Sequence, residues 1–567
     1  MPQNPDAMSQ IMAESQTAPV LRVQDPAQVH WLNLLPVTSG MSVIKLGATR
    51  IEIIKALAIA CRRPIACVGG PHGPAPDSLT ISYPSWQAAP QKAFDLAVVD
   101  EADDLTSLKT AARLRTELKS ILAVLKQDGC LVLCLPEGLR NVRMRYLLAE
   151  AVAYSGFHAV DSYLCDPSCE RPLEVVPFSA NPSWALQYLS RPGVWDSGGT
   201  LRRLKRILKW FVFAATGIHN PLRGLLLIAR RSLLPATRDG LSCYGQVLRQ
   251  VTAGLPDSGQ PIAVLSATSQ GKQYLSIYDS RTSDLLAVAK VGRKCYRHSD
   301  IVEQEHQNLR LLSPLVSFLG EKGIIIPQLL GVDVSEQTIF FSMKAMPGRP
   351  FESTVRPLVK QGDRRRIEEL LNAVVERHIF LQDFLTNRFS AAIPEVAPKF
   401  FETPLRVAGR VIEGKAFPLV PFGFVQHGDF STINIYFDPL RDRWGVIDWE
   451  SLGRGYPPLV DLFSLLRTVG FRENPRSRSH RRNEPIQSFI DSFFRRNWFS
   501  QYCATVVRRY SAACGIDVRI VYDCFLLFIL FFYNRYALDE VVVEGFADLY
   551  KEMMAYSVAN QHQFALL

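Results

Sequence analysis

The arrangement of apolar residues changes near position 235, and this change limits the fold more than any other feature of the sequence. Before it, short continuous apolar runs alternate with segments of helical spacing. Continuous apolar runs suit strands that are buried on both faces, so the alternation predicts a doubly wound α/β domain with a parallel sheet. After it, strand patterns come first and helical patterns follow, which predicts a separate α+β architecture. The four runs are MSVIKLG, IACVGG, FDLAVVD and GCLVLCL.

The chain has 567 residues, which is too long for one hydrophobic core. We expect a disordered tail, an α/β domain, a linker rich in Gly, Pro and Ser, a small lobe of antiparallel strands with one inserted helix, and a larger helical lobe. In that order their ranges are 1–30, 31–235, 236–260, 261–350 and 351–567. The inserted helix has Leu309, Leu312 and Val316 at helical spacing, and Asp363 is expected to cap the first long helix of the larger lobe.

Charge and cysteine content point to a compartment and a class of partner. The formal charge is +10, which favours anionic partners, among them nucleotides, phosphorylated metabolites, acidic lipids and nucleic acid. The eleven cysteines are scattered and no secretory signal is visible, so a cytoplasmic location is expected. Cys130 and Cys134 lie in an apolar run and are expected to face the same side of a buried strand; zinc is the less favoured interpretation.

Two segments bear on membranes. The run CFLLFILFFY at 524–533 has ten residues, about half of the 20 or so that a spanning helix needs, and is predicted to be a core helix. The basic amphipathic stretch at 201–213 could provide peripheral contact with an anionic bilayer. A domain-closing helix and strand with a solvated basic face is the favoured alternative for that stretch.

The segment FVQHGDFSTINIYFDPLRDRWGVIDWE at 424–450 carries the strongest chemical pattern. A loop is followed by two β-rich segments that are joined by a turn at Asp438, which predicts a hairpin. Such a hairpin presents Asn434 at the start of one strand and Asp448 at the end of the other, with Asp429 five residues before Asn434. Carboxylate and amide oxygens on a rigid frame suit Mg²⁺ bound mainly through nucleotide phosphates.

The order HGDFSTIN, IDWE and GYPPLVDL resembles the aminoglycoside phosphotransferase and choline kinase family, whose fold is two-lobed and protein-kinase-like. Upstream, AVAKVG, EQEHQNLRLL and MKAMPGRP resemble the strand with the nucleotide lysine, the helix with its glutamate and the segment that joins the lobes. The resemblance covers roughly 260–555. It implies an ATP-dependent small-molecule O-phosphotransferase of the aminoglycoside phosphotransferase type, with Mg²⁺; GTP remains an alternative donor.

The resemblance also implies roles for individual residues. Asp429 would accept or orient the proton of the attacking hydroxyl, and Asn434 and Asp448 would hold Mg²⁺. Lys290 would contact the α- and β-phosphates and pair with Glu305; Lys294 is the weaker substitute. The remaining expectations are adenine contacts along 343–346, a backbone-supporting histidine and a structural carboxylate, assigned to Met343, Met346, His427 and Asp461.

The expected acceptor is a small hydroxylated molecule, such as an amino sugar, a sugar or an amino alcohol. Only about nine residues separate Asp448 from the Pro457-Pro458 pair, which leaves no room for a peptide-docking segment, and Gly428 stands where protein kinases place arginine. The basic tract at 476–482 is expected to be a solvated loop rather than an acceptor site. No nucleic-acid partner is expected.

The first domain resembles class I methyltransferases, a Rossmann-like family, but departs from their cofactor pattern. Gly47 remains in the first loop while Thr49 and Ile51 fill the other glycine places, and Lys45 stands where an acidic residue is expected. The run CVGG ends without a carboxylate for the ribose. S-adenosylmethionine binding is therefore not expected. The alternatives to a kinase with an inactive companion domain are a bifunctional methyltransferase-kinase and a catalytically silent kinase-like sensor.

Overall fold

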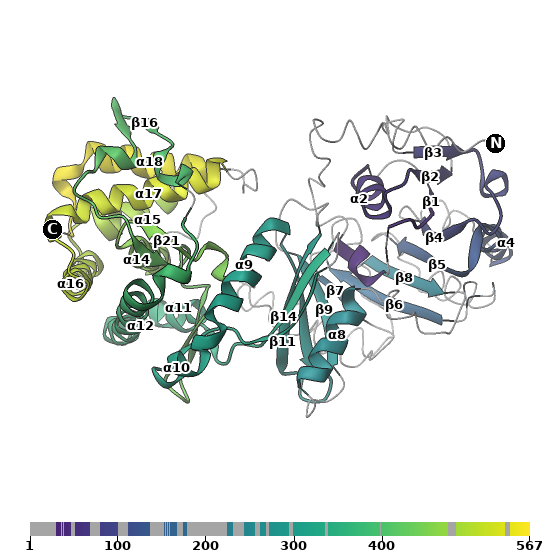
Figure 1. Ribbon diagram of the computed structural model, residues 1–567, viewed down its shortest axis with the longest axis horizontal. Helices are drawn as coiled ribbons and strands as arrows, with labels where there is room; N and C mark the ends of the chain where they lie inside the picture. Colours follow the sequence, from purple (N-terminus) through teal and green to yellow (C-terminus); the bar gives the residue numbers. More distant parts are fainter. Residues whose placement is uncertain are drawn as a thin grey trace. The chain divides into compact units, whose positions relative to one another are not determined.

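The computed structural model divides into two compact units. Met1–Asp300 together with Leu330–Ser342 form the first unit, and Ile301–Leu329 together with Met343–Leu567 form the second (Figure 1). The structure describes 30–46 except 36 and 38, 51–68, 80–99, 111–135, 152, 155, 157, 159–166, 174–177, 224–230, 243–255, 261–267, 272–293, 299–334, 338–396, 398–473, 484–538 and 545–566. Outside these residues lie the basic stretch at 201–213, Gly47, Thr49, Lys294 and the tract at 476–482.

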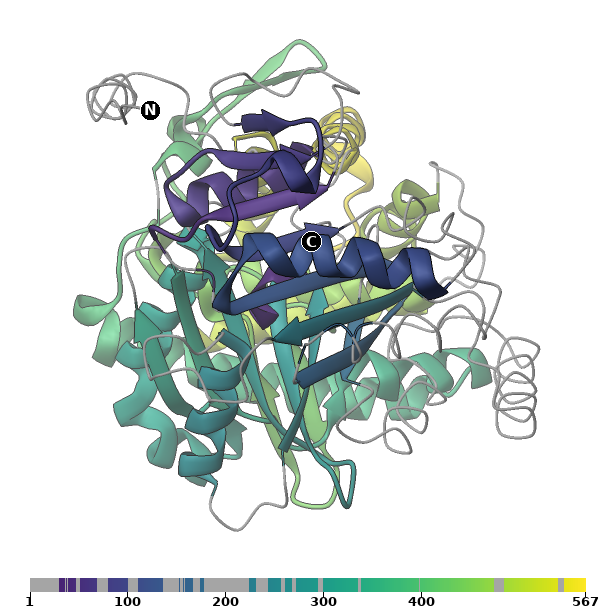
Figure 2. The ribbon, with the colours of Figure 1, turned by 90° about the vertical axis from the view of Figure 1, so that its right-hand side faces the viewer.

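The first unit is built on a sheet of thirteen strands, and one half of that sheet is parallel. Its order begins β3-β2-β1-β4-β5, with all neighbours parallel, which is the order of a doubly wound nucleotide-binding sheet. In Figure 2 the purple and blue elements of this half face the viewer. The five strands are β1 (Val43–Leu46), β2 (Ile65–Val68), β3 (Thr80–Tyr83), β4 (Phe94–Val99) and β5 (Leu125–Leu135).

Helices cover both faces of the parallel half. Side chains alternate along each strand, so Val98 of β4 joins one core and Val99 joins the other. Helix α2 (Ile51–Cys61) contributes to the first core and helix α4 (Ala111–Val124) to the second. The doubly wound α/β prediction is therefore confirmed. Cys130 and Cys134 are both buried on the first face, as the strand interpretation predicted.

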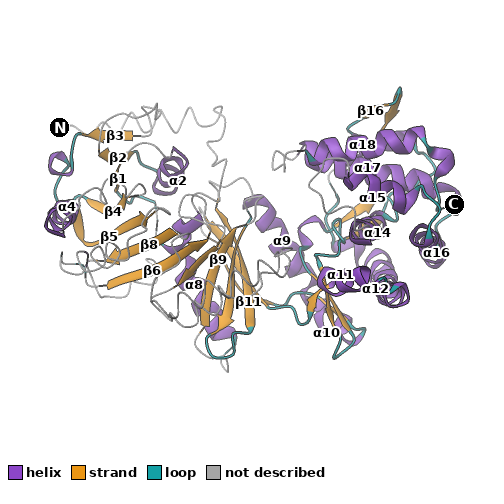
Figure 3. Cartoon of the chain, turned by 180° about the vertical axis from the view of Figure 1, so that it is seen from behind, coloured by secondary structure: helices purple, strands orange, loops and turns teal. Residues whose placement is uncertain are grey.

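The other half of the sheet is antiparallel and continues without a break into the strands expected for the small lobe. Strand β7 pairs with β9 through Glu174 opposite Ser266 and Val175 opposite Leu265. Figure 1 labels β7 and β9 next to each other, and Figure 3 shows β9 and β11 of the same sheet in orange. From β5 onward the order is β8 (Gly224–Arg230), β6 (Ala159–Asp166), β7 (Glu174–Pro177), β9 (Pro261–Ala267), β10 (Gln273–Asp279), β11 (Leu285–Arg293), β14 (Thr338–Lys344) and β13 (Leu329–Val334).

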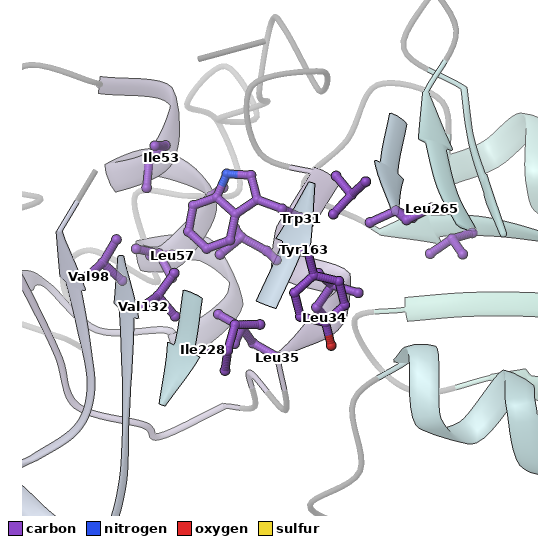
Figure 4. Packing of buried hydrophobic residues seen from close by; sticks show 14 of the residues in the cluster. Trp31, Leu34, Leu35, Ile53, Leu57, Val98, Val132, Tyr163, Ile228 and Leu265 are labelled. Atoms are coloured by element: carbon purple, nitrogen blue, oxygen red, sulfur yellow. The ribbon is translucent and has the colours of Figure 1, made fainter. Parts of the chain in front are cut away.

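Two short segments cover the face where the halves of the sheet meet. The 3-10 helix η2 (His30–Leu34) places Trp31 in the core among residues of α2 and the sheet (Figure 4). Helix α8 (Cys243–Gly254) buries Val247 and Val251 in the same core. The structure thus differs from the prediction of a linker over 236–260, because apolar residues at helical spacing lie between the Gly, Pro and Ser residues of that segment.

A buried polar network joins η2 to the small-lobe strands of the first unit. The Arg293 Nε donates to Asn33 Oδ1 at 2.7 Å, and Arg293 Nη2 donates to Leu32 O at 3.2 Å. Asn33 Nδ2 in turn donates to Gln273 Oε1 at 2.7 Å. The exposed fractions of Arg293, Asn33 and Gln273 are 5%, 0% and 2%. A buried guanidinium is tolerated only when it is hydrogen-bonded, so these contacts fix β10 and β11 to the start of the α/β domain.

The second unit combines a four-stranded sheet with a helical body. The predicted inserted helix is present but breaks at Pro314, so it forms α9 (Ser299–Leu312) and α10 (Val316–Glu321). Asp363 caps the next long helix as predicted, because its side chain accepts from Arg366 N at 3.1 Å. The sheet order is β12 (Ile324–Ile325), β20 (Arg443–Val446), β19 (Ile435–Asp438) and β15 (Arg349–Pro350). The main helices are α11 (Phe351–Gln361), α12 (Arg364–Phe384), α14 (Val460–Glu473), α15 (Glu484–Phe493), α16 (Trp498–Ala513), α17 (Val521–Leu538) and α18 (Phe546–Ala559).

Helix α17 is the apolar centre of this helical body. Among the described residues, Val518–Leu538 is the one segment long and apolar enough to cross a membrane, and 72% of its apolar 18-residue window is buried inside the structure. Its aromatic side chains contact those of α14, α15 and α18, as in the Phe463–Phe525 pair with ring centroids 5.2 Å apart. The prediction of a buried core helix is confirmed.

Candidate active site

The hairpin predicted at the centre of the motif is formed by β19 and β20. Ile435 lies opposite Val446, and Ile447 N donates to Asn434 O at 2.9 Å. The turn is closed by Asp438, whose Oδ1 accepts from Leu440 N at 3.1 Å. Because Asn434 and Ile447 face each other across the open end, Asn434 and Asp448 lie at the same end of the hairpin.

The loop before the hairpin brings Asp429 to Asn434. The Asn434 Nδ2 donates to Asp429 O at 3.0 Å, which leaves the amide oxygen of Asn434 as the group that can coordinate a cation. Asp448 has φ of +63°, a left-handed conformation that few non-glycine residues adopt. Backbone strain of this kind clusters at functional sites. The structure therefore gathers Asp429, Asn434 and Asp448 at one end of the hairpin.

His427 ties the loop to the hairpin through both ring nitrogens. Its Nδ1 accepts from Asp429 N at 3.2 Å, and its Nε2 lies 2.9 Å from Ile447 O. A neutral ring with the proton on Nε2 satisfies both contacts. Burial lowers the pKa of His427, although Asp429 and the carbonyl of Ile447 oppose the shift. This is the geometry expected of a histidine that supports the loop's backbone.

Asp461 holds the same loop through hydrogen bonds to its backbone. Located in the first turn of α14, it accepts from His427 N at 2.7 Å with Oδ2 and from Gly428 N at 2.9 Å with Oδ1. Burial raises the pKa of Asp461 to about 7, while the two backbone N–H groups act in the opposite direction. The side chain is only 1% exposed, so its contacts are those of a carboxylate that braces the backbone.

Three carboxylates gather beside the hairpin. Oxygen atoms of Glu305, Asp448 and Glu450 lie within 4.8 Å of one another. Like charges at this distance repel, and hard oxygen donors are the ligands that Mg²⁺ prefers. Asp448, which lies at the same end of the hairpin as Asn434, is therefore beside carboxylates that raise the local negative charge, and this suits a divalent cation.

The remaining expected residues belong to different parts of the structure. Lys290 is half-buried in β11 of the first unit, and Glu305 is buried in α9 of the second, so their predicted pairing stays a prediction. Met343 is buried at the end of β14. Met346 packs on the hairpin, where a Cβ at Gly445 would lie 2.3 Å from its sulfur. A larger residue at position 445 would therefore require the side chain of Met346 to move.

The structure adds two residues that the sequence interpretation did not single out. Glu450 is the last residue of the IDWE motif, and Arg535 is the basic residue in the last turn of α17. The Arg535 Nη2 donates to Glu450 Oε1 at 3.1 Å, and Nη1 donates to Gly428 O at 3.2 Å. The one sequence signal for Arg535 is a cation directly after a long apolar run.

In the first domain the structure shows where one departure from the methyltransferase pattern lies. Lys45 is fully buried in β1, and its Nζ donates to Leu46 O at 3.2 Å. An ammonium group thus occupies the strand position at which an acidic residue was expected. The loop that follows lies outside the described residues, as do the last two residues of CVGG.

Comparison with known proteins supports the phosphotransferase interpretation. Residues 288–490 match the phosphotransferase enzyme family. This stretch includes all the residues that the sequence interpretation assigned to the kinase site, from Lys290 to Asp461, and it excludes Arg535. The resemblance to phosphotransferases is confirmed over the matched residues, and with it the kinase-like second part of the fold class. Comparison with curated proteins gives no match.

Solved structures of both kinds are similar to parts of the chain. An aminoglycoside phosphotransferase from Streptomyces rimosus is 17% identical over 51% of this chain and 97% of its own, with a TM-score of 0.29. A SAM-dependent methyltransferase from Archaeoglobus fulgidus is 14% identical over 36% of this chain and 92% of its own, with a TM-score of 0.24. Spermidine synthase from Thermotoga maritima is 9% identical over 38% of this chain and 64% of its own, also with a TM-score of 0.24.

Proposed function

We propose that this chain is a kinase that transfers the γ-phosphate of ATP to a hydroxyl group of a small molecule, with Mg²⁺. The observation that carries the proposal is the convergence of Asp429, Asn434 and Asp448 at one end of the β19–β20 hairpin, inside the segment that matches the phosphotransferase enzyme family. Phosphoryl transfer needs mainly positioning and charge neutralisation from a protein, and this site provides groups for both.

In this proposal each side chain has a distinct role. Asp429 accepts the proton of the attacking hydroxyl, and His427 and Asp461 hold its loop in place. Asn434 and Asp448 hold Mg²⁺, which when bound shields the negative charge of the triphosphate. Lys290 contacts the α- and β-phosphates and pairs with Glu305, and the backbone between Met343 and Met346 accepts the nucleotide base.

The segment after Asp448 supports a small acceptor. It forms a 3-10 turn at Trp449–Ser451 and then strand β21 (Gly453–Tyr456), which pairs with β18 (Phe424–Gln426) before α14 begins. The pairing leaves no extended segment on which a peptide could dock. A sugar, amino sugar or amino alcohol is therefore the proposed acceptor class.

The test is a transfer assay with γ-labelled ATP, Mg²⁺ and a library of hydroxylated metabolites. We expect Asp429→Asn to lower the transfer rate by about 10²–10⁴-fold, because an amide cannot take the proton. The matched control is Asp442→Asn, which makes the same chemical change at an exposed position of the β19–β20 turn and should leave the rate unchanged. Undiminished transfer by Asp429→Asn would refute the assignment of the base.

A further inference from the structure

Helix α17 contains a cation that packing alone does not explain. Its sequence is VYDCFLLFILFFYNRYAL, and Arg535 is its one basic residue. The side chain is only 17% exposed although it carries a full charge. Removing a guanidinium from water costs several kcal/mol unless charged partners and hydrogen bonds compensate it. A residue of this kind in the last turn of an apolar helix therefore needs specific partners.

The partners of Arg535 are the two segments that form the proposed site. One guanidinium nitrogen donates to the carbonyl of Gly428, the residue before Asp429, and another pairs with Glu450, two residues after Asp448. The Glu450 side chain is 7% exposed and that of Arg535 is 17% exposed, so this ion pair is largely removed from water. Burial alone would lower the pKa of Arg535, but the nearby carboxylates of Asp429 and Glu450 raise the pKa by more. The net shift is upward, so the group stays charged.

The contact with Glu450 also affects the carboxylate cluster. Glu450 lies within 4.8 Å of both Glu305 and Asp448 and would be available to a cation if it were not paired. While Arg535 neutralises Glu450, the cation is left to Asp448 and the amide oxygen of Asn434. Without Arg535, the Glu450 carboxylate would compete for the cation as a third protein ligand and change its position.

We propose that Arg535 is a positioning residue for phosphoryl transfer: it fixes the peptide before Asp429 and keeps Glu450 from binding the catalytic cation. This inference rests on the proposed function and extends it to a residue outside the segment that matches the family. The mechanism predicts two separable effects of losing Arg535. The base is displaced, which lowers turnover, and Glu450 becomes a cation ligand, which changes the dependence on Mg²⁺.

The experiment compares four variants of the full chain with the wild type: Arg535→Ala, Arg535→Lys, the double variant Arg535→Ala/Glu450→Gln, and Tyr522→Phe. The last is the matched control, because it removes a hydrogen bond to Ser557 O at the other end of α17. Binding of ATP is measured by calorimetry over a series of Mg²⁺ concentrations. Turnover is measured as ATP hydrolysis, with water in place of the acceptor.

We expect Arg535→Ala to lower turnover about 100-fold, the loss expected when a catalytic group moves by about 1 Å. We also expect it to reach half-maximal ATP binding at a Mg²⁺ concentration several times lower than the wild type. The double variant should restore the Mg²⁺ dependence but not the turnover. Tyr522→Phe should lower thermal stability alone. If the alanine variant does not fold, Arg535→Lys must show both effects in weaker form.

Two results separate the inference from the function on which it rests. If both Arg535 variants bind ATP with the Mg²⁺ dependence of the wild type and keep its turnover, the inference is wrong and the proposed kinase activity stands. If the wild type itself binds no ATP at any Mg²⁺ concentration, the proposed function is wrong and the inference falls with it.

Discussion

His378 and His427 are both buried in the second unit, but they have different surroundings. Both ring nitrogens of His427 have partners, whereas neither ring nitrogen of His378 has a hydrogen-bond partner among the described residues. The ring of His378 stacks on Phe430, the residue after Asp429, with centroids 4.3 Å apart. Burial, aided by the nearby His427, lowers the pKa of His378 to about 3. The folded protein therefore keeps this ring neutral.

This shift predicts how stability depends on pH. The folded pKa of His378 lies below its ordinary value of 6.5, so unfolding takes up a proton at pH values between about 3 and 6.5, and stability falls as the pH decreases through that window. Between pH 7 and pH 5, His378 should cost the wild type about 2 kcal/mol of unfolding free energy. Phenylalanine keeps the stacking and removes the titration.

Urea unfolding of the wild type and His378→Phe at pH 7 and pH 5 tests this prediction. The variant should be at least as stable as the wild type at pH 7, because a buried polar group without partners is removed. It should lose about 2 kcal/mol less on acidification. Equal losses in the two proteins would show that His378 is charged or hydrated in the folded state.

Residues of the site differ in how well the sequence predicts their positions. Asp429, Asn434 and Asp448 lie on one short loop and hairpin, so their proximity follows from local structure. The contact between Arg535 and Glu450 joins residues 85 positions apart, and it depends on how α17 packs in the helical body. The sequence pattern predicts that α17 is a buried helix, but it does not predict which loop the last turn of α17 contacts.

Gly428 shows how an element can require one residue type. Its φ is +82°, and a Cβ there would lie 2.6 Å from the Tyr456 hydroxyl and 2.7 Å from Ser451. Gly409, in the turn between two short strands, has φ of +75°, but a Cβ there would meet no other part of the described chain within 4 Å. The two glycines therefore share backbone strain, but only Gly428 lacks space.

Alanine substitutions at these glycines should have unequal effects. Gly409→Ala should cost about 1 kcal/mol of unfolding free energy, from the left-handed backbone alone. Gly428→Ala should cost about 1–3 kcal/mol more, because the loop must move away from Tyr456, and it should also lower phosphoryl transfer. Urea unfolding of both variants gives the comparison. Equal losses would contradict the packing described for the loop.

The helices differ in how strongly the sequence pattern predicts them. Helix α12 has a capping aspartate and a long apolar stripe, and α17 contains the continuous apolar run at 524–533, so the sequence predicts both helices. Helix α8 is short and lies between Gly, Pro and Ser residues, so its composition suggested a linker. The segment is helical because Val247 and Val251 pack into a hydrophobic core. Strands that are distant in the sequence form that core.

At the scale of the whole molecule, the α/β domain and the small-lobe strands of the first unit share one sheet and one core. This arrangement predicts that a fragment of residues 261–567 does not fold alone. It would leave the β9 edge without β7, and it would expose the apolar face that η2 and α8 cover. The fragment would also lack Asn33 and Leu32, which accept hydrogen bonds from the buried guanidinium of Arg293. Solubility and thermal melting of the fragment and the full chain test this.

A point variant of the full chain tests the hydrogen bonds around Arg293 without removing the rest of the α/β domain. Asn33→Ala in the full chain should cost about 2–3 kcal/mol, since a buried guanidinium loses a partner. The control is Asn387→Ala, because Asn387 is exposed and its side chain donates to Asp383 one turn earlier. That change should stay within about 0.5 kcal/mol. A soluble fragment that melts like the full chain would refute the shared core.

The pairing of β7 with β9 also constrains the ancestry of this chain. A gene that lost its first half would leave the strands around Lys290 without their cover, so we expect the two halves to be inherited together. Selection on phosphoryl transfer would then also preserve the methyltransferase-like half, because the neighbouring strands depend on it for cover.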